Sequence, residues 1–174
     1  MSQRFWSKLQ SRPNRAALIN AARTATAAVA SFLVARACRL PEAYWAAVST
    51  MIVMQSSLGA ALPIAGRRFA GAALGAASGA LIGLCFRPNV WIFGAGVFLL
   101  GLICALLGRA NKSLRETLDS SAYRYAGITL AATILIPRPL PIWMVAAHRF
   151  CEVSIGIAVA LAITVLWPDR SADR

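Results

Sequence analysis

The residues best suited to chemistry lie inside the most apolar part of the chain. His148, Arg149 and Glu152 fall in the first half of a run from Ile142 to Trp167 that is otherwise uncharged. A charged side chain near the centre of a bilayer costs about 2.5 to 3.5 kcal/mol on insertion scales, so such residues usually face a partner or a watery path. Glu152 is a candidate for proton exchange because burial favours its neutral form and a nearby arginine its charged form. His148 is a second candidate, since histidine as a residue type has a near-neutral intrinsic pKa. The cluster predicts a substrate or proton path within a membrane.

Composition supports a membrane location for this run. The 174 residues are 59% hydrophobic and 14% charged, with a mean hydropathy of +0.64. All eight prolines lie at or outside the limits of six apolar runs, as helix-breaking residues should. We therefore predict an all-α, polytopic membrane helix bundle with six transmembrane helices in residues 16–167, between a basic cytoplasmic N-tail (1–15) and a cytoplasmic C-tail (168–174). The predicted spans are Ala16–Ala35, Ala43–Leu62, Phe69–Phe86, Val90–Leu107, Leu118–Ile136 and Ile142–Trp167.

The distribution of basic residues predicts the orientation of these spans. Eleven Lys and Arg side chains fall in the two tails and the second and fourth loops, and four fall in the opposite loops. Because cytoplasmic loops carry the excess of Lys and Arg, both termini are expected in the cytoplasm. The net charge of +12 would indicate nucleic acid in a soluble protein, but the apolar content argues against that partner.

Counting 1.5 Å per residue along each span brings several polar side chains to similar depths. Arg149 lies roughly 10 Å below the outer edge, Glu152 roughly 15 Å, Arg124 and Gln55 roughly 18 Å, and Arg23 roughly 20 Å, in a core about 30 Å thick. The excess of arginine predicts a path that favours anions. Three simpler alternatives stay open: Arg149 and Glu152 form only an intrahelical pair, Arg23 and Arg124 extend to the headgroups, and His148 packs between helices.

The third span carries a different pattern. Gly71, Gly75, Gly79 and Gly83 recur at every fourth residue, which lets another helix approach to backbone contact. The partner helix belongs either to the same chain or to a second copy. One histidine, no nucleophile–base–acid set and no Cys or His spacing typical of metal sites predict no enzyme, no metal and no cofactor.

Four segments resemble the fusaric acid resistance protein-like (FUSC) family, also called aromatic acid exporters: residues 40–55 (LPEAYWAAVSTMIVMQ), 66–75 (GRRFAGAALG), 123–129 (YRYAGIT) and 148–156 (HRFCEVSIG). The resemblance implies proton-driven efflux of aromatic carboxylic acids and related organic anions across the bacterial inner membrane. For such a transporter we expect Arg124 and Arg149 to attract the carboxylate, nearby aromatic side chains to contact the ring, and Glu152 to carry the proton. The positions implied by the matching segments are Tyr44, Trp45, Arg68, Arg124, Arg149 and Glu152, with Tyr125 as a further aromatic contact.

The resemblance also bears on assembly. Familiar members of this family join two six-span halves or add a cytoplasmic region, whereas this chain carries one half. A homodimer in the lipid bilayer is therefore expected. Two other functions stay open: a passive organic-anion channel, and a nontransporting membrane subunit or scaffold of a larger complex.

Overall fold

The computed structural model describes residues 15–55, 57–87, 89–110, 120–137 and 139–168. All regular elements in these ranges are helices. The predicted N-tail, apart from Arg15, and the C-tail after Pro168 lie outside the described residues, as does most of the fourth loop. The helices are α2 (Arg15–Ala37), α3 (Tyr44–Val53), α4 (Leu58–Cys85), α5 (Val90–Ala110), α7 (Ser120–Ile134) and α8 (Ile142–Leu166).

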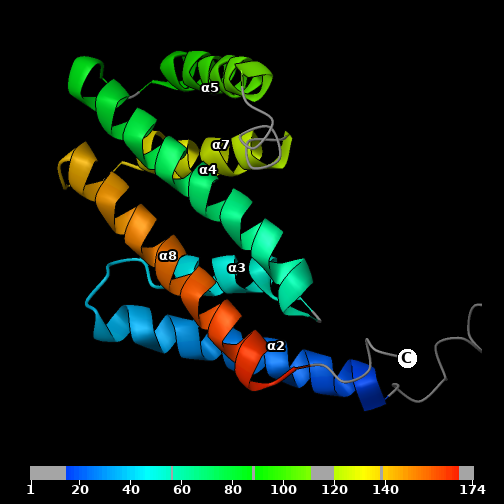
Figure 1. Cartoon of the computed structure of the whole chain (residues 1–174). Helices are drawn as coiled ribbons and strands as arrows, with labels where there is room; N and C mark the ends of the chain where they lie inside the picture. The colour runs from blue at the N-terminus through cyan, green and yellow to red at the C-terminus, as the bar shows by residue number, and fades with distance from the viewer. Residues whose placement is uncertain (1–14, 56, 88, 111–119, 138, 169–174) are drawn as a thin grey trace, which may run out of the picture.

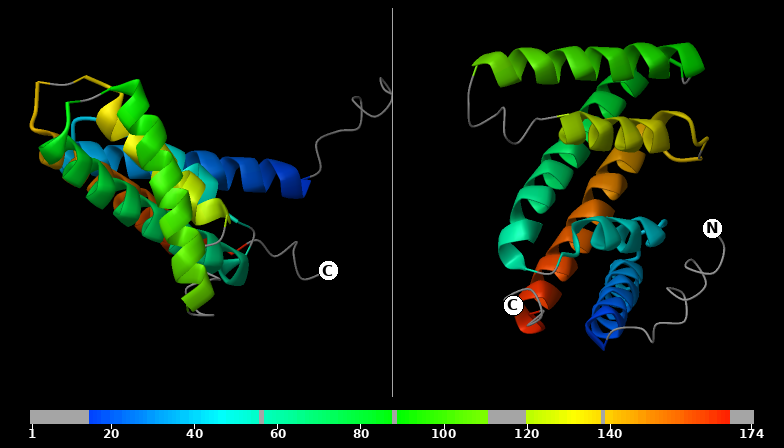
Figure 2. Two further views of the ribbon diagram at one scale, coloured as in Figure 1. Left: turned by 90° about the horizontal axis from the view of Figure 1, so that it is seen from above. Right: turned by 90° about the vertical axis from the view of Figure 1, so that its right-hand side faces the viewer.

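The two long helices α4 and α8 pack side by side and form the spine of the bundle (Figure 1). The helices α2 and α3 cross this pair at one end, and α5 and α7 cross it at the other (Figure 2). Successive described helices run in alternating directions across Figure 1. This arrangement places the loop between α2 and α3, α3 itself and the middle of α8 together.

The expected second span is wrong in its boundaries. The helix α3 has ten residues, so it is about 15 Å long and too short to cross a hydrocarbon core of about 30 Å. The backbone then leaves the helix, and α4 starts again after Ser57, whose hydroxyl accepts a hydrogen bond from the Ala60 N–H at 3.4 Å. Serine is one of the preferred helix N-cap residues. The prediction missed this helix start because Ser57 lies inside a run that is apolar on both sides.

The expected loop at residues 63–68 is also wrong, because Pro63, Arg67 and Arg68 all lie inside the 28-residue helix α4. Pro63 is the sixth residue of the helix. It removes one backbone donor there, and the helix continues through it nonetheless. The two arginines therefore drop out of the loop count that predicted the orientation.

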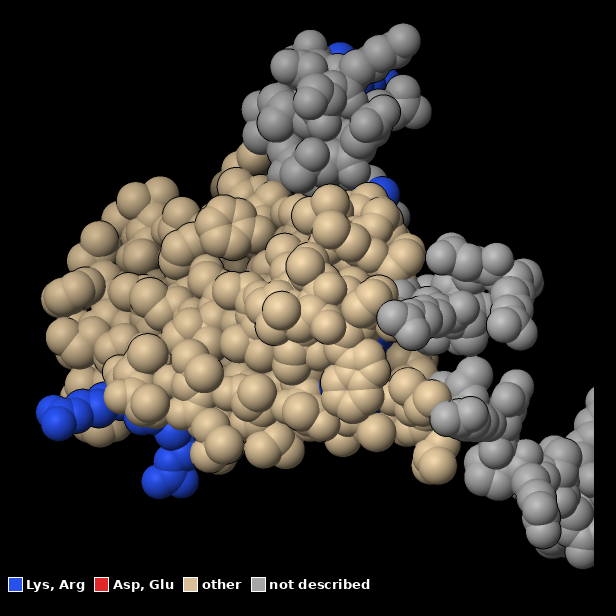
Figure 3. All heavy atoms as spheres, turned by 60° about the horizontal axis from the view of Figure 1, so that its bottom comes forward, with Lys and Arg blue, Asp and Glu red and all other residues tan. Residues whose placement is uncertain are grey.

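Three helical segments are long and apolar enough to span a membrane: Ala17–Ala37, Leu58–Cys85 and Ile142–Leu166. Two shorter apolar helices, Tyr44–Val53 and Val90–Leu106, accompany them. The face drawn in Figure 3 is formed almost entirely by uncharged side chains, with basic side chains mainly at its edge and no acidic side chain visible among the described residues. The described part of the chain is thus an all-helical membrane bundle.

The four glycines of the repeat on α4, from Gly71 to Gly83, pack against helices of the same chain. A Cβ atom on Gly71 would lie 2.6 Å from the Ala122 carbonyl oxygen, and one on Gly75 would lie 2.4 Å from the Ala126 carbonyl oxygen. Gly79 faces Thr133 in the same way, so three of the four glycines contact α7. Gly83 instead faces Ile142 at the start of α8. The glycine repeat therefore packs against α7 and α8 of the same chain, and these are the partner helices that the sequence left unidentified.

Replacing Gly75 with alanine tests this contact. We expect Gly75→Ala to lower the free energy of unfolding by about 1 to 3 kcal/mol, because its methyl group overpacks the backbone of α7. A methyl group at Gly66 on the same helix would meet no neighbouring atom within 4 Å. The matched Gly66→Ala should therefore be neutral or stabilising by up to about 1 kcal/mol, through helix propensity. Denaturant unfolding in detergent micelles, followed by circular dichroism, measures both; equal stabilities would contradict the close packing.

Candidate functional site

Arg149 and Glu152 form an ion pair inside the bundle. Both lie in the middle part of α8, and their exposed fractions are 2% and 0%. The Nη1 group of Arg149 donates a hydrogen bond to Oε2 of Glu152 at 3.0 Å. Arg149 and Glu152 are three residues apart, and residues at this interval lie on the same face of a helix, so their side chains can form an ion pair.

Glu42, in the segment between α2 and α3, completes the cluster. Its carboxylate accepts a hydrogen bond from Nη2 of Arg149, and its backbone N–H donates to Oε1 of Glu152 at 3.0 Å. The Tyr44 hydroxyl also donates to the Glu42 carboxylate. Two carboxylates therefore share one guanidinium, so this group carries a formal charge of −1 when all three residues are ionised. Sequence analysis missed Glu42 because it assigned the residue to a loop; the only signal was its position inside a segment that resembles the family.

Trp45 covers the cationic member of the cluster. The centre of the Arg149 guanidinium lies 4.9 Å from the centroid of the Trp45 ring, a distance typical of a cation–π contact. Trp45 is the second residue of α3, directly after the Tyr44 that binds Glu42. The beginning of α3 is thus fixed over the charged face of α8.

A glycine on α8 allows α3 to come this close. A Cβ atom at Gly156 would lie 2.3 Å from the Ala46 carbonyl oxygen and 2.9 Å from Cβ of Ser49. The Thr50 hydroxyl lies 2.9 Å from the carbonyl oxygens of both Gly156 and Ala46. Because Gly156 is four residues after Glu152, the helix contact and the ion pair lie on one face of α8.

Arg68 is a second buried arginine with different surroundings. It lies on α4 with an exposed fraction of 1%, and its Nη2 group donates to the Ser49 hydroxyl at 3.2 Å. Its guanidinium centre lies 5.0 Å from the centroid of the Tyr125 ring on α7. Gly71, three residues further along α4, lets Tyr125 approach, because a Cβ there would lie 2.6 Å from that of Tyr125.

Arg23 binds the backbone just after the C-terminal ends of α3 and α8. This fully buried residue of α2 donates from Nη1 to the Trp167 carbonyl oxygen at 3.0 Å and from Nη2 to the Gln55 carbonyl oxygen. Both carbonyls follow the last residues of helices, where backbone acceptors lack intrahelical donors. Gln55 therefore contributes its backbone to this contact.

The remaining predicted residues lie apart from the charged cluster or at its margin. Arg124 is exposed on α7, whereas the ion pair is buried on α8. His148 is half-buried, and its Nδ1 atom has no hydrogen-bond partner among the described residues. No group of three His, Cys, Asp or Glu side chains in the described part of the chain is arranged to hold a metal ion.

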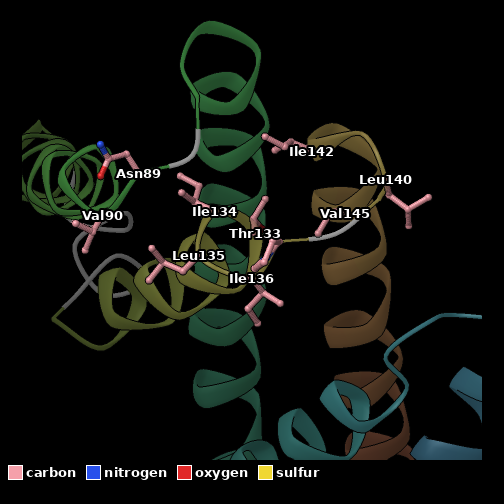
Figure 4. Close-up of a pocket in the computed structure, with 10 residues that line it drawn as sticks. Asn89, Val90, Thr133, Ile134, Leu135, Ile136, Leu140, Ile142 and Val145 are labelled. Atoms are coloured by element: carbon pink, nitrogen blue, oxygen red, sulfur yellow. The ribbon is translucent and has the colours of Figure 1, made fainter.

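A cavity of about 470 Å³ lies at the start of α8 (Figure 4). Its lining comes from the end of α7, the loop that follows, and the starts of α5 and α8, and it is apolar apart from Asn89 and Thr133. The cavity does not include the buried arginines. Its lining residue Val145 precedes Arg149 by four residues on α8, so the cavity lies about one helical turn from the charged cluster.

Comparison with known proteins is consistent with these features. Residues 26–163 match the family described as fusaric acid resistance protein-like. The chain belongs to this family. It is also similar to the inner membrane protein YeeA of Escherichia coli (strain K12), with 27% identity over 159 residues, which is 88% of this chain and 42% of YeeA. The chain thus spans less than half the length of this curated relative. No solved structure matches it.

Measurements of the free energy of unfolding test whether Arg149 balances the charge of Glu42 and Glu152. We expect Arg149→Gln to lower the free energy of unfolding by about 3 to 5 kcal/mol, because it leaves two carboxylates without their shared cation. Adding Glu152→Gln should recover part of this loss, with a coupling energy of about 1 kcal/mol or more.

The exposed Arg87 provides the control, since Arg87→Gln should stay within about 0.5 kcal/mol of the parent chain. Denaturant unfolding in micelles measures all of these proteins, together with Glu152→Gln alone. Strictly additive effects of the Arg149 and Glu152 substitutions would show that the pair does not act as a unit.

Proposed function

We propose that this protein is a transporter of the bacterial inner membrane that exports aromatic carboxylic acids or related organic anions. Six crossings with both termini in the cytoplasm would require the second crossing to combine α3 with the residues beside it, because the ten-residue helix alone is too short. The family description refers to resistance to fusaric acid, which is itself an aromatic carboxylic acid, and the name of the E. coli relative supports the location. Buried charge in a membrane bundle is expensive, and it usually marks an ion or substrate pathway.

The observation that carries the proposal is the pair of carboxylates on Arg149. Glu42 and Glu152 both contact one guanidinium, so the uptake of a single proton brings the cluster from a formal charge of −1 to neutrality. Like charges that share a site disfavour full ionisation of both groups. We assign proton coupling to this cluster, with Glu152 as the more buried of the two acids.

We further propose that two copies form the working transporter. The chain covers 42% of its curated relative, which leaves room in that protein for a second unit of similar size. The glycine ridge of α4 packs against α7 and the start of α8 within one chain, so the dimer contact would use another surface. The measured mass in nanodiscs tests this part of the proposal.

Transport in proteoliposomes tests the proton role, with benzoate as the probe. We expect Glu152→Gln to reduce pH-driven benzoate flux by about tenfold or more, equivalent to about 1.4 kcal/mol in the barrier, because the amide cannot carry the proton. Cys151 is exposed on the neighbouring position of α8, so Cys151→Ser should retain the parent flux within about twofold.

Three results would contradict parts of this proposal. Unchanged pH-driven flux in Glu152→Gln would remove the proton role of that residue. Benzoate flux that follows the anion gradient and ignores pH in the parent protein would indicate a passive channel. Absence of flux for a panel of aromatic acids, together with a second protein that copurifies in fixed proportion, would indicate a nontransporting subunit.

A further inference from the structure

The two buried arginines near α3 differ in how their charge is balanced. Arg149 contacts two carboxylates, so its positive charge is more than offset. Among the described residues, no carboxylate forms an ion pair with Arg68; its contacts are the Ser49 hydroxyl and the Tyr125 ring. A buried cation without a counter-charge is costly, and an anionic ligand removes that cost.

The donors of Arg68 are also incompletely used. A guanidinium has five N–H groups, and the hydrogen bond to Ser49 uses one of them. The Nε and Nη1 atoms are buried and have no hydrogen-bond partner among the described residues. The residue itself is 99% buried, since its exposed fraction is 1%. Its chemistry therefore fits a ligand that brings both negative charge and several acceptor atoms, as a carboxylate does.

The neighbours of Arg68 suit an aromatic acid in particular. The Tyr125 ring already packs against the guanidinium, and aromatic rings prefer to pack against one another at offset or edge-on angles. The Ser49 hydroxyl can donate to a carboxylate oxygen as well as accept from Arg68. These three side chains come from α3, α4 and α7, so the site forms only when all three helices are in place.

We propose that Arg68, with Ser49 and Tyr125, binds the carboxylate of the transported aromatic acid, at a site separate from the Arg149 cluster. This inference rests on the proposed transport function and names the residue that holds the anion. It moves the anion site away from Arg149, where sequence analysis expected it. The Arg149 guanidinium already contacts two carboxylates, so its cluster is left to the proton.

The position of α3 connects the two sites. Trp45, which covers Arg149, and Ser49, which contacts Arg68, are four residues apart and share one face of the helix. The donors of Arg68 are closed from solvent here, so a carboxylate reaches them only after a helix moves. The ten-residue α3 is the shortest helix of the site, and it lies between the non-helical residues 38–43 and 54–55.

Binding measurements on the purified protein in nanodiscs test the site, with benzoate and its neutral analogue benzamide as probes. The parent protein should prefer benzoate by about tenfold or more, which corresponds to about 1.4 kcal/mol. Arg68→Gln should bring the ratio of the two affinities close to one. The neighbouring Arg67 is only half-buried, and Arg67→Gln should keep the parent ratio.

Two outcomes would overturn the site. A folded Arg68→Gln protein that retains the parent preference for benzoate would exclude Arg68 as its anion-binding residue. If Arg68→Gln does not fold, Arg68→Lys replaces it; lysine keeps the charge but loses the planar set of donors, so its benzoate affinity should fall severalfold. Parent affinity in Arg68→Lys would equally overturn the site. A parent protein that binds and transports none of the acids would instead reject the proposed function.

Discussion

A guanidinium buried in an apolar helix bundle must find compensation from the protein, because lipid offers none. Arg149 meets this requirement with two carboxylates from different parts of the chain, Glu152 on its own helix and Glu42 before α3. The second contact draws the loop between α2 and α3 onto the face of α8. The placement of α3, and with it the position of Trp45 and Ser49, depends on this interaction.

Small residues make that placement possible. Gly156 brings the backbone of α3 against α8, and the glycines of α4 do the same for α7. Apolar side chains of membrane helices gain little from leaving lipid, so close backbone packing and buried polar contacts must hold the helices together. In this bundle the two occur side by side: Gly156 lies one turn from Glu152, and Gly71 lies near Arg68.

Part of this arrangement was predictable from the sequence. The interval between Arg149 and Glu152 allowed an ion pair, which was left open as an alternative, and the four-residue glycine repeat predicted close helix packing. Both inferences depend on the period of one helix. Depth counting grouped Arg124 with the buried charges, yet it is exposed. Depth along a helix says nothing about direction around its axis. Arg68 was assigned to a loop because Pro63 was taken as a helix limit, and Glu42 was overlooked because its partners are 107 and 110 residues away.

The three arginines that are buried in the described part of the chain differ in how their charge is compensated. Arg23 is compensated by backbone carbonyls at helix ends, Arg149 by carboxylates, and Arg68 by a hydroxyl and an aromatic ring. Only the carboxylates cancel a full charge. The Arg149 guanidinium is thus paired with acidic side chains, whereas no carboxylate among the described residues pairs with Arg68, and α3 contacts both arginines. Because Trp45 and Ser49 lie on one short helix, any displacement of α3 would alter both contacts together.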